Sequence, residues 1–268
     1  MDITFLLSFL ILGLAIGLFA GLFGIGGGGT MVPVLTFIFT KLAFPAEHIV
    51  HMALATSMAA IVPTALASLR AHHSRAAVLW PVVITITPGI LLGTFAGTFL
   101  ASYLSAQALA IFFSAFMALV ALQMIRNQNP KASRTLPGRA VLSGVGAAIG
   151  GVSSLVAIGG GSMTVPFLLW CNVALPVAIG TSAAIGLPIA MAGAAGYVIN
   201  GWSLEHLPPH TLGFVYWPAV IAIASASFFT APLGARLAHS LPVPLLKKLF
   251  ALLQICLSVQ MLATVFGH

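Results

Sequence analysis

The sequence predicts an all-α polytopic membrane protein made of two inverted-topology repeats of five segments each, with glycine-broken or re-entrant short helices. The first observation is composition: 60% of the 268 residues are apolar and 5% are charged, against roughly 25% charged residues in an ordinary soluble domain. The residues from Ala140 to Leu204 include no Asp, Glu, Lys or Arg. Such a chain cannot cover its apolar surface in water, so we expect it to lie in a lipid bilayer.

The second observation is an internal repeat. Residues 13–35 match residues 146–168 without gaps, with 12 identities in 23 positions. The matched stretches contain two glycine runs, one in each half of the chain. Paired breaks of this kind in apolar segments are typical of transporters whose solute is held between two repeats.

Charged and polar residues divide each half into five apolar segments. In order, these are about 3–23, 30–42, 49–69, 77–100 and 106–125, then 140–158, 163–175, 176–199, 212–238 and 242–266. A helix needs about 20 apolar residues to cross a bilayer, and most segments meet that length. The segments 30–42 and 163–175 have 13 residues each, so we expect half-helices that follow the two glycine runs.

The repeat continues through the later segments of each half. The third segments share a Thr-Ser pair and a proline, Thr56-Ser57 with Pro63 and Thr181-Ser182 with Pro188. The fourth share Trp-Pro (Trp80-Pro81 and Trp217-Pro218), and the fifth share Gln-Met (Gln123-Met124 and Gln260-Met261). The sequence therefore predicts membrane repeat 1 over residues 1–126, a polar cytoplasmic linker over 127–139 and membrane repeat 2 over 140–268.

Loop charges predict the orientation. Basic residues follow the third segment, fill the linker and surround the loop before the last segment, whereas the loops at 102–106 and 201–211 carry no Lys or Arg. Basic loops favour the cytoplasm. With five segments in each half, this placement inverts the second half relative to the first and puts both termini outside.

The charge balance favours an anionic solute. The net charge is +7, and the three acidic residues, Asp2, Glu47 and Glu205, all lie at segment ends. No carboxylate lies at mid-membrane to hold a cation. In a chain of this kind the excess of Lys and Arg marks cytoplasmic loops rather than nucleic-acid binding. We expect a small anion and the lipid bilayer as partners; the oligomeric state stays open. The two cysteines and eight histidines show no zinc-type spacing, so we expect no metal site and no cofactor.

The glycine runs carry the predicted chemistry. Backbone amides in hydrocarbon must be satisfied, so a break of this kind faces protein or a water-filled cavity. Each run precedes a short helix, whose N-terminus presents N–H groups and a partial positive charge. Two such ends would hold an anion without a lysine. Close helix packing is the alternative use of these glycines. The predicted site residues are Gly26, Gly27, Gly28, Gly29, Thr30, Pro33, Thr56, Ser57, Gly159, Gly160, Gly161, Ser162, Thr164, Pro166, Thr181 and Ser182.

These motifs resemble those of the sulfite exporter TauE/SafE family of bacterial membrane transporters. The resemblance rests on Gly24-Ile25-Gly26-Gly27-Gly28-Gly29-x-x-Val32-Pro33, on Ala55-Thr56-Ser57, and on their echoes Ile158-Gly159-Gly160-Gly161-x-x-x-Val165-Pro166 and Gly180-Thr181-Ser182. It covers essentially the whole chain. It implies movement of small sulfur-containing anions, such as sulfite or organosulfonates, across the cytoplasmic membrane of a bacterium.

The hypothesis favoured by the sequence is a secondary transporter that works by alternating access, with the anion held at the midplane by the paired glycine-loop helix N-termini. A passive anion channel and a transporter of another small anion are the alternatives. A membrane-embedded enzyme would need grouped acids or an activated nucleophile in a pocket, so we do not expect an enzyme. His51 has no counterpart in the second half, where Pro176 stands, and we interpret it as an interfacial histidine.

Overall fold

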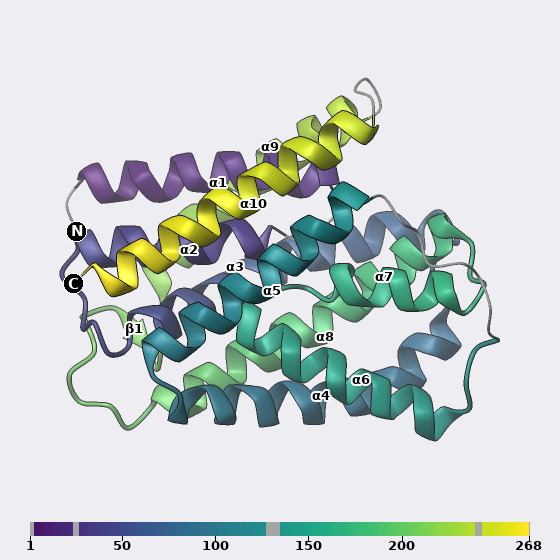
Figure 1. Ribbon diagram of the computed structural model, residues 1–268, viewed down its shortest axis with the longest axis horizontal. Helices are drawn as coiled ribbons and strands as arrows, with labels where there is room; N and C mark the ends of the chain where they lie inside the picture. The colour runs from purple at the N-terminus through teal and green to yellow at the C-terminus, as the bar shows by residue number, and fades with distance from the viewer. Residues whose placement is uncertain (1–2, 24–26, 127–134, 239–242, 268) are drawn as a thin grey trace.

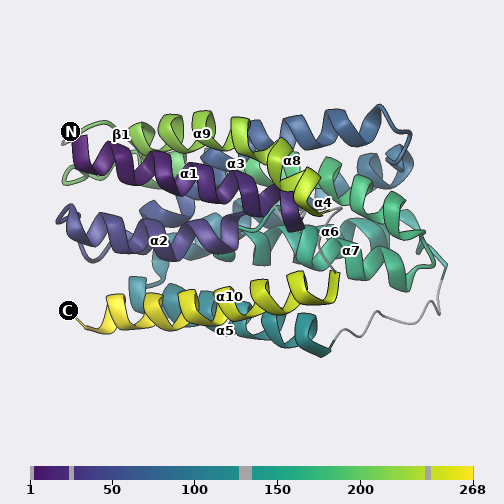
Figure 2. The ribbon, with the colours of Figure 1, turned by 90° about the horizontal axis from the view of Figure 1, so that it is seen from above.

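The computed structural model describes residues 3–23, 27–126, 135–238 and 243–267, and most of these residues lie in long helices packed side by side (Figures 1 and 2). In chain order the helices are α1 (Ile3–Phe23), α2 (Gly28–Lys41), α3 (Ile49–His73), α4 (Trp80–Tyr103), α5 (Ala106–Arg126), α6 (Arg139–Val156), α7 (Gly161–Trp170), α8 (Leu175–Gly201), α9 (Trp217–Ala238) and α10 (Val243–Phe266). A short antiparallel hairpin, β1 (Thr211–Leu212) and β2 (Val215–Tyr216), joins α8 to α9.

The predicted all-α polytopic fold is confirmed. Among the described residues, six helices are long and apolar enough to cross a bilayer. They are α3, α4, α5, α6, α8 and the 248–266 part of α10. The other expected segments are also helical, and most helices begin and end within a few residues of the expected bounds. The predicted linker falls largely on residues 127–134, which lie outside the described part of the chain.

The expected segment 212–238 is wrong at its start. Residues 211–216 form the hairpin, and α9 begins only at Trp217. Gly213 takes a positive φ of 54° in the hairpin turn, a conformation that glycine adopts without strain. A Cβ at Gly213 would also overlap the backbone of Val198 in α8. The turn therefore lies directly against α8.

The helices pair across the two halves of the chain. α1 packs against α9 and α6 packs against α4, so each first helix lies beside the fourth helix of the other half. The third helices, α3 and α8, pack together, as do the fifth helices, α5 and α10. In Figures 1 and 2 the start of α1 and the end of α10 lie at one end of the bundle, and the end of α5 and the start of α6 lie at the other. The inverted topology and the outside position of the termini stay predictions.

Glycines let the paired helices approach closely. On α4, Gly89 and Gly93 lie directly against Ser143 and Ala147 of α6, where a Cβ would overlap the backbone. Gly13 on α1 meets α9 at Ile223 in the same way. These glycines recur at intervals of four residues and bring two helix backbones together, which is the ordinary use of small residues in membrane helices.

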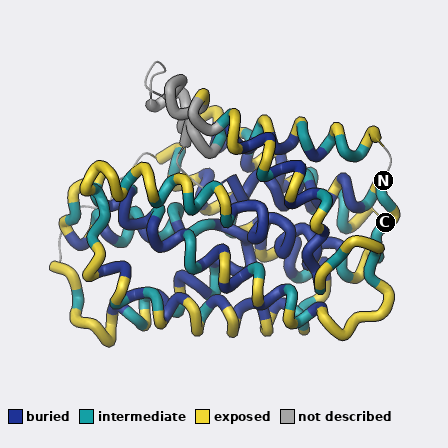
Figure 3. The backbone as a smooth tube through the Cα atoms, turned by 180° about the vertical axis from the view of Figure 1, so that it is seen from behind, coloured by how far each residue is buried: buried dark blue, intermediate teal, exposed yellow. Residues whose placement is uncertain are grey.

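The core is centred on α3. Its residues from Ile49 to Ile61 are all buried. Outer helices carry large exposed apolar side chains, such as Leu92 on α4 and Phe229 on α9. Figure 3 shows this distribution, with buried segments along the middle of the bundle and exposed positions along its outer surface. Since lipid tails cover apolar surface as well as protein does, this outer surface suits a bilayer.

Candidate functional site

The first glycine run ends at the start of α2. Gly27 is the residue before the helix and has a positive φ of 68°, which favours glycine. Its carbonyl oxygen accepts hydrogen bonds from the backbone N–H groups of Thr30 and Met31, at 3.1 Å each. The N–H groups of Gly28 and Gly29 therefore lie ahead of the helix's own hydrogen-bond ladder. Gly27 to Thr30 are all buried, so this electropositive helix end lies inside the protein. Gly26 is outside the described residues.

The second run repeats this geometry at α7. Gly160 has a φ of 80°, and its carbonyl oxygen accepts from the N–H groups of Met163 (3.1 Å) and Thr164 (2.8 Å). Gly161 and Ser162 correspond to Gly28 and Gly29. The hydroxyl oxygens of Ser162 and Thr164 are buried and have no hydrogen-bond partner within the described part of the chain. Both short helices thus begin in the same way, as the repeated sequence predicts.

The start of α2 lies against the residue that leads into the second glycine run. A Cβ at Gly28 would overlap the carbonyl oxygen of Ala157, the residue that ends α6 and leads into the second run. Ile61 of α3 is beside both runs, with side-chain atoms 3.0 Å from the Cβ position of Gly28 and 3.9 Å from that of Gly159. The structure therefore brings the start of α2 next to the segment that leads into α7. Gly160 packs elsewhere, because a Cβ at this residue would lie 2.8 Å from the side chain of Ile189 in α8.

Each short helix contains a proline, Pro33 or Pro166. A proline has no N–H, so it cannot bond the carbonyl four residues back. In α2 that carbonyl belongs to Gly29, and in α7 it belongs to Ser162. The two prolines therefore lie at equivalent positions and loosen the first turn of each helix rather than pointing a polar group at a solute.

The two threonines of the Thr-Ser pairs have reciprocal partners. The N–H of Leu79, just before α4, donates to the hydroxyl of Thr181 in α8 at 2.9 Å. The N–H of Tyr216, just before α9, donates to the hydroxyl of Thr56 in α3 at 3.1 Å. Each threonine thus binds the backbone at the start of the fourth helix of the other half. In this conformation their hydroxyls join the two halves of the protein.

The serines of the same pairs differ from the threonines. Ser57 is completely buried, and its hydroxyl has no partner in the described residues. It lies one helical turn before Ile61, on the same face of α3, and Ile61 contacts both glycine runs. Ser182 is buried in α8, three residues before Ile185, whose side chain is 3.8 Å from the Cβ position of Gly160. Each serine thus lies one helical turn before an isoleucine whose side chain packs beside a glycine run.

Sequence reasoning missed Gln254. This side chain of α10 is 1% exposed, and its Nε2 donates to the hydroxyl of Thr30 at 3.4 Å. Nε2 also lies 3.3 Å from the Cβ position of Gly29. The sequence does contain a signal for this residue, since Gln254 is a single amide side chain within the otherwise apolar run from Phe250 to Leu257.

His51 lies away from the glycine runs. It is 2% exposed, its Nε2 is 2.9 Å from the carbonyl oxygen of Ala101, and its ring stacks on Phe214 of the hairpin with centroids 5.2 Å apart. The hairpin missed by the sequence covers the ring of His51, and the interfacial position expected for this residue stays a prediction. In the part of the chain that the structure describes, no group of three or more His, Cys, Asp or Glu side chains could hold a metal ion.

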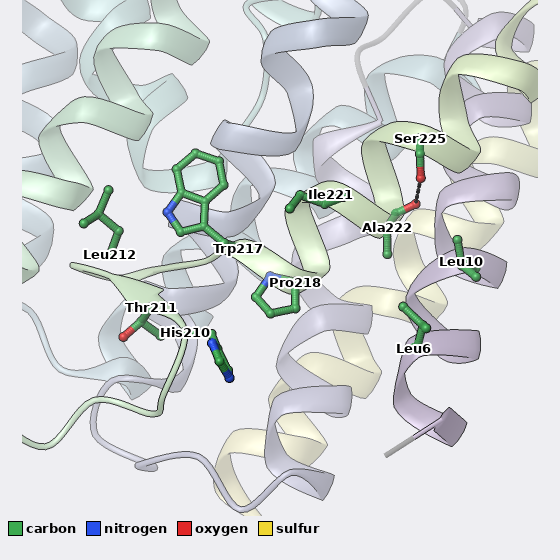
Figure 4. Close-up of a pocket in the computed structure, with 10 residues that line it drawn as sticks. All are labelled: Leu6, Leu10, His210, Thr211, Leu212, Trp217, Pro218, Ile221, Ala222 and Ser225. Carbon is green, nitrogen blue, oxygen red and sulfur yellow. Dashed lines mark hydrogen bonds between the residues drawn. The ribbon is translucent and has the colours of Figure 1, made fainter. Parts of the chain in front are cut away.

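An open pocket of about 660 Å³ lies between α1, the hairpin and the start of α9 (Figure 4). Its lining residues are Leu6, Leu10, His210, Thr211, Leu212, Trp217, Pro218, Ile221, Ala222 and Ser225. Within this group the Ser225 hydroxyl donates to the carbonyl of Ala222 at 3.0 Å, and the backbone N–H of Trp217 donates to the carbonyl of His210 at 3.3 Å. The pocket includes none of the predicted site residues, and its apolar lining suits hydrocarbon better than an anion.

Comparison with known proteins places the chain among transporters. A family model described as "Sulfite exporter TauE/SafE" matches residues 9–261. A probable membrane transporter protein of Haemophilus influenzae is 35% identical over 261 residues, 96% of this chain and 98% of the relative. A probable membrane transporter protein of Xylella fastidiosa is 27% identical, covering 88% of this chain and 87% of the relative. Another, from Bacillus subtilis, is 25% identical, covering 84% and 86%. No solved structure matches the chain significantly.

Proposed function

Because the chain belongs to the sulfite exporter TauE/SafE family and is a multi-pass membrane transporter rather than an enzyme, we propose that it moves small sulfur-containing oxyanions by secondary transport. The proposed substrates are of the sulfite or organosulfonate class, and the proposed location is the cytoplasmic membrane of a bacterium. The two halves of the chain move relative to each other around one central site, which opens to one side of the membrane at a time.

The arrangement of α2 and α7 carries this proposal. Each helix begins after a buried glycine of positive φ, and the start of α2 lies against Ala157, four residues before α7 begins. Helix N-termini attract anions through unpaired N–H groups and a partial positive charge. Glycine at this point allows an oxyanion to approach the backbone N–H groups directly.

The distribution of charge supports an anion. The helices from α1 to α10 include no Asp or Glu in their sequences. The acidic residues Glu47 and Glu205 lie in exposed loops. An anion at the glycine runs therefore meets no negative side chain, and a cation would meet no counter-charge.

The absence of a lysine or arginine from the candidate site has a functional consequence. Backbone N–H groups and hydroxyls hold an anion through hydrogen bonds without a full opposite charge, so the bound solute can be released on the other side. The buried, unpartnered hydroxyls of Ser57, Ser162 and Thr164 supply further donors. A fully charged partner would bind the same anion more strongly and slow its release.

The test is flux in proteoliposomes. The purified protein is reconstituted, and uptake of labelled sulfite, thiosulfate and a small sulfonate is measured against protein-free vesicles. We expect saturable uptake of at least one of these anions, with each of the others competing. Preloading the vesicles with unlabelled anion should accelerate uptake, because a carrier returns faster when loaded. If no sulfur oxyanion moves, the proposed substrate class is wrong.

The two alternatives give different results in the same vesicles. A passive anion channel would give uptake that does not saturate and is not accelerated by preloading. A transporter of another small anion would leave sulfite uptake at background while showing counterflow for a different solute, such as a carboxylate. The thermal stability of the protein with each anion provides an independent measure of binding.

A further inference from the structure

We propose that the side-chain amide of Gln254 binds the transported oxyanion directly, at the start of α2. This inference rests on the proposed function, because it places one more residue in the same site. Neither the glycine motifs nor the Thr-Ser pairs include Gln254, which comes from α10, the last helix of the chain.

The position of the amide is the first argument. Gln254 Nε2 lies 3.4 Å from the hydroxyl of Thr30 and 3.3 Å from the Cβ position of Gly29. These residues form the first turn of α2, where the unpaired N–H groups are. An oxyanion held by the N–H groups of Gly28 and Gly29 would therefore lie within reach of the amide.

The hydrogen bonding of the amide is the second argument. Gln254 is 1% exposed, and its Oε1 has no partner among the residues that the structure describes. A buried polar atom without a partner is unfavourable, so such atoms usually have a functional explanation. The bond to Thr30 is long at 3.4 Å and does not by itself account for an amide at this depth. A polar ligand beside the first turn of α2 would satisfy it.

Comparison of the two halves gives the third argument. The shift of 137 residues that relates the fifth segments places Met117 of α5 at the position equivalent to Gln254 of α10. Both side chains reach Gly29, and the Sδ atom of Met117 is 3.1 Å from its Cβ position. A thioether would fill this space without any unpaired polar atom. The amide thus stands at a position where the other half of the protein uses an apolar side chain.

An amide side chain also suits an oxyanion that can carry a proton, as sulfite can. Its NH₂ group donates to an anionic oxygen, and its carbonyl accepts from the O–H of a protonated oxyanion. The same side chain can therefore hydrogen-bond both the singly protonated and the fully ionised form of sulfite, whereas a lysine has no acceptor for the O–H and an ionised glutamate has no donor for the anionic oxygens. Which amide atom faces Thr30 is set by the hydrogen-bond network and can reverse when an anion binds.

The test compares Gln254→Leu and Gln254→Met with Gln260→Leu, a matched control in the same helix. The reconstituted wild type and variants are assayed for KM and Vmax with labelled sulfite, and for the shift in melting temperature that sulfite produces. We expect both Gln254 variants to raise KM by about tenfold or more, the factor for one hydrogen bond to a charged group. They should also lose most of the sulfite-dependent thermal shift. Gln260→Leu should match the wild type.

Gln254→Glu is the second kind of variant, because it preserves shape but replaces the donating NH₂ group by an oxygen that accepts, so that the Thr30 hydroxyl becomes the donor. At a pH where the new carboxyl is ionised, it faces the oxyanion with like charge, and we expect KM to rise further than in Gln254→Leu. Lowering the pH protonates the carboxyl and should restore part of the affinity. This pH dependence tests whether residue 254 lies within electrostatic range of the anion, and the Leu and Met variants test direct contact.

The outcomes separate the inference from the proposed function. If the wild type moves no sulfur oxyanion, the proposed function is wrong and the inference falls with it. If the wild type transports sulfite while Gln254→Leu and Gln254→Met, folded by their melting curves, keep KM within about twofold of wild type, the inference alone is wrong. A fall in Vmax or in stability with unchanged KM also overturns it, because that result assigns Gln254 to packing.

Discussion

The bond between Leu79 and Thr181 gives the sharpest test of whether the Thr-Ser motif binds the solute or holds the two halves together. Thr181→Val replaces the hydroxyl by a methyl group of similar size and removes the acceptor for the Leu79 N–H, now bonded at 2.9 Å. Leaving a buried donor unpaired costs about 1–3 kcal/mol. Leu79 is only partly buried, so we expect the lower half of this range, about 1–2 kcal/mol.

The assay is thermal unfolding of the detergent-solubilised protein, combined with sulfite uptake by the reconstituted variants. By the scaling of soluble domains of 150–250 residues, roughly 2–4 °C per kcal/mol, Thr181→Val should lower the melting temperature by several degrees. Thr181→Ser retains the oxygen and should lose much less. Thr56→Val, which removes the reciprocal bond, should act in the same direction. KM should stay close to wild type, because the hydroxyls are engaged by backbone.

The control is Thr87→Val on α4. The Thr87 hydroxyl donates to the carbonyl of Val83 in its own helix, at 2.6 Å. Its removal therefore leaves no backbone N–H group without a hydrogen-bond partner. The reasoning is refuted if Thr181→Val leaves the melting temperature at the level of Thr87→Val while KM rises severalfold. That result would assign the hydroxyl of Thr181 to the anion.

Two further predictions concern the packing of the site and the buried histidine. Gly28→Ala would place a Cβ against the carbonyl of Ala157; we expect a loss of about 1–3 kcal/mol by overpacking and of most anion uptake. Gly144→Ala, where a Cβ would meet open space, should be neutral or stabilising by up to about 1 kcal/mol; equal behaviour of the two variants would contradict the close contact. His51→Phe retains a ring but loses the bond to Ala101, so we expect about 1 kcal/mol lower stability and preserved uptake. Loss of uptake in a folded His51→Phe would instead assign that residue to transport.

The helices could be predicted from sequence because their ends carry strong local signals. Arg70 lies in the last turn of α3 and Arg139 begins α6, and the residues 77–125 and 140–204 include no Asp, Glu, Lys or Arg. Consecutive glycines before α2 and α7 have no packing period and mark a break in the chain. The expectation that two short helices begin there followed from these glycines and from the 13-residue length of each apolar segment after them. The first and last turns remained uncertain by a few residues, since helix ends depend on caps as well as composition.

The roles of single polar side chains could not be predicted in the same way. The hairpin at 211–216 depends on a contact between Gly213 and Val198, and a stretch such as Leu212–Tyr216 has no local signal that separates a strand from a helix start. Once the hairpin is in place, it supplies the N–H that Thr56 accepts and the ring that covers His51. Those partners are more than a hundred residues away in sequence, so spacing within one segment could not identify them.

The surroundings of the two short helices differ in a way that bears on transport. α10 packs against α2, and Met117 of α5 also reaches Gly29, whereas α5 makes no comparable contact with α7 in the portion that the structure describes. If the two halves exchange surroundings during alternating access, Met117 comes to lie against Ser162, the counterpart of Gly29. The amide of Gln254 and the thioether of Met117, which both reach Gly29 now, would then exchange places around the proposed site, so the two conformers would differ in affinity for the proposed anion. This difference cannot drive net transport, because the anion must shift the conformational equilibrium toward the tighter conformer by the same free energy. The direction of net flux therefore depends on the gradients across the membrane and not on Gln254.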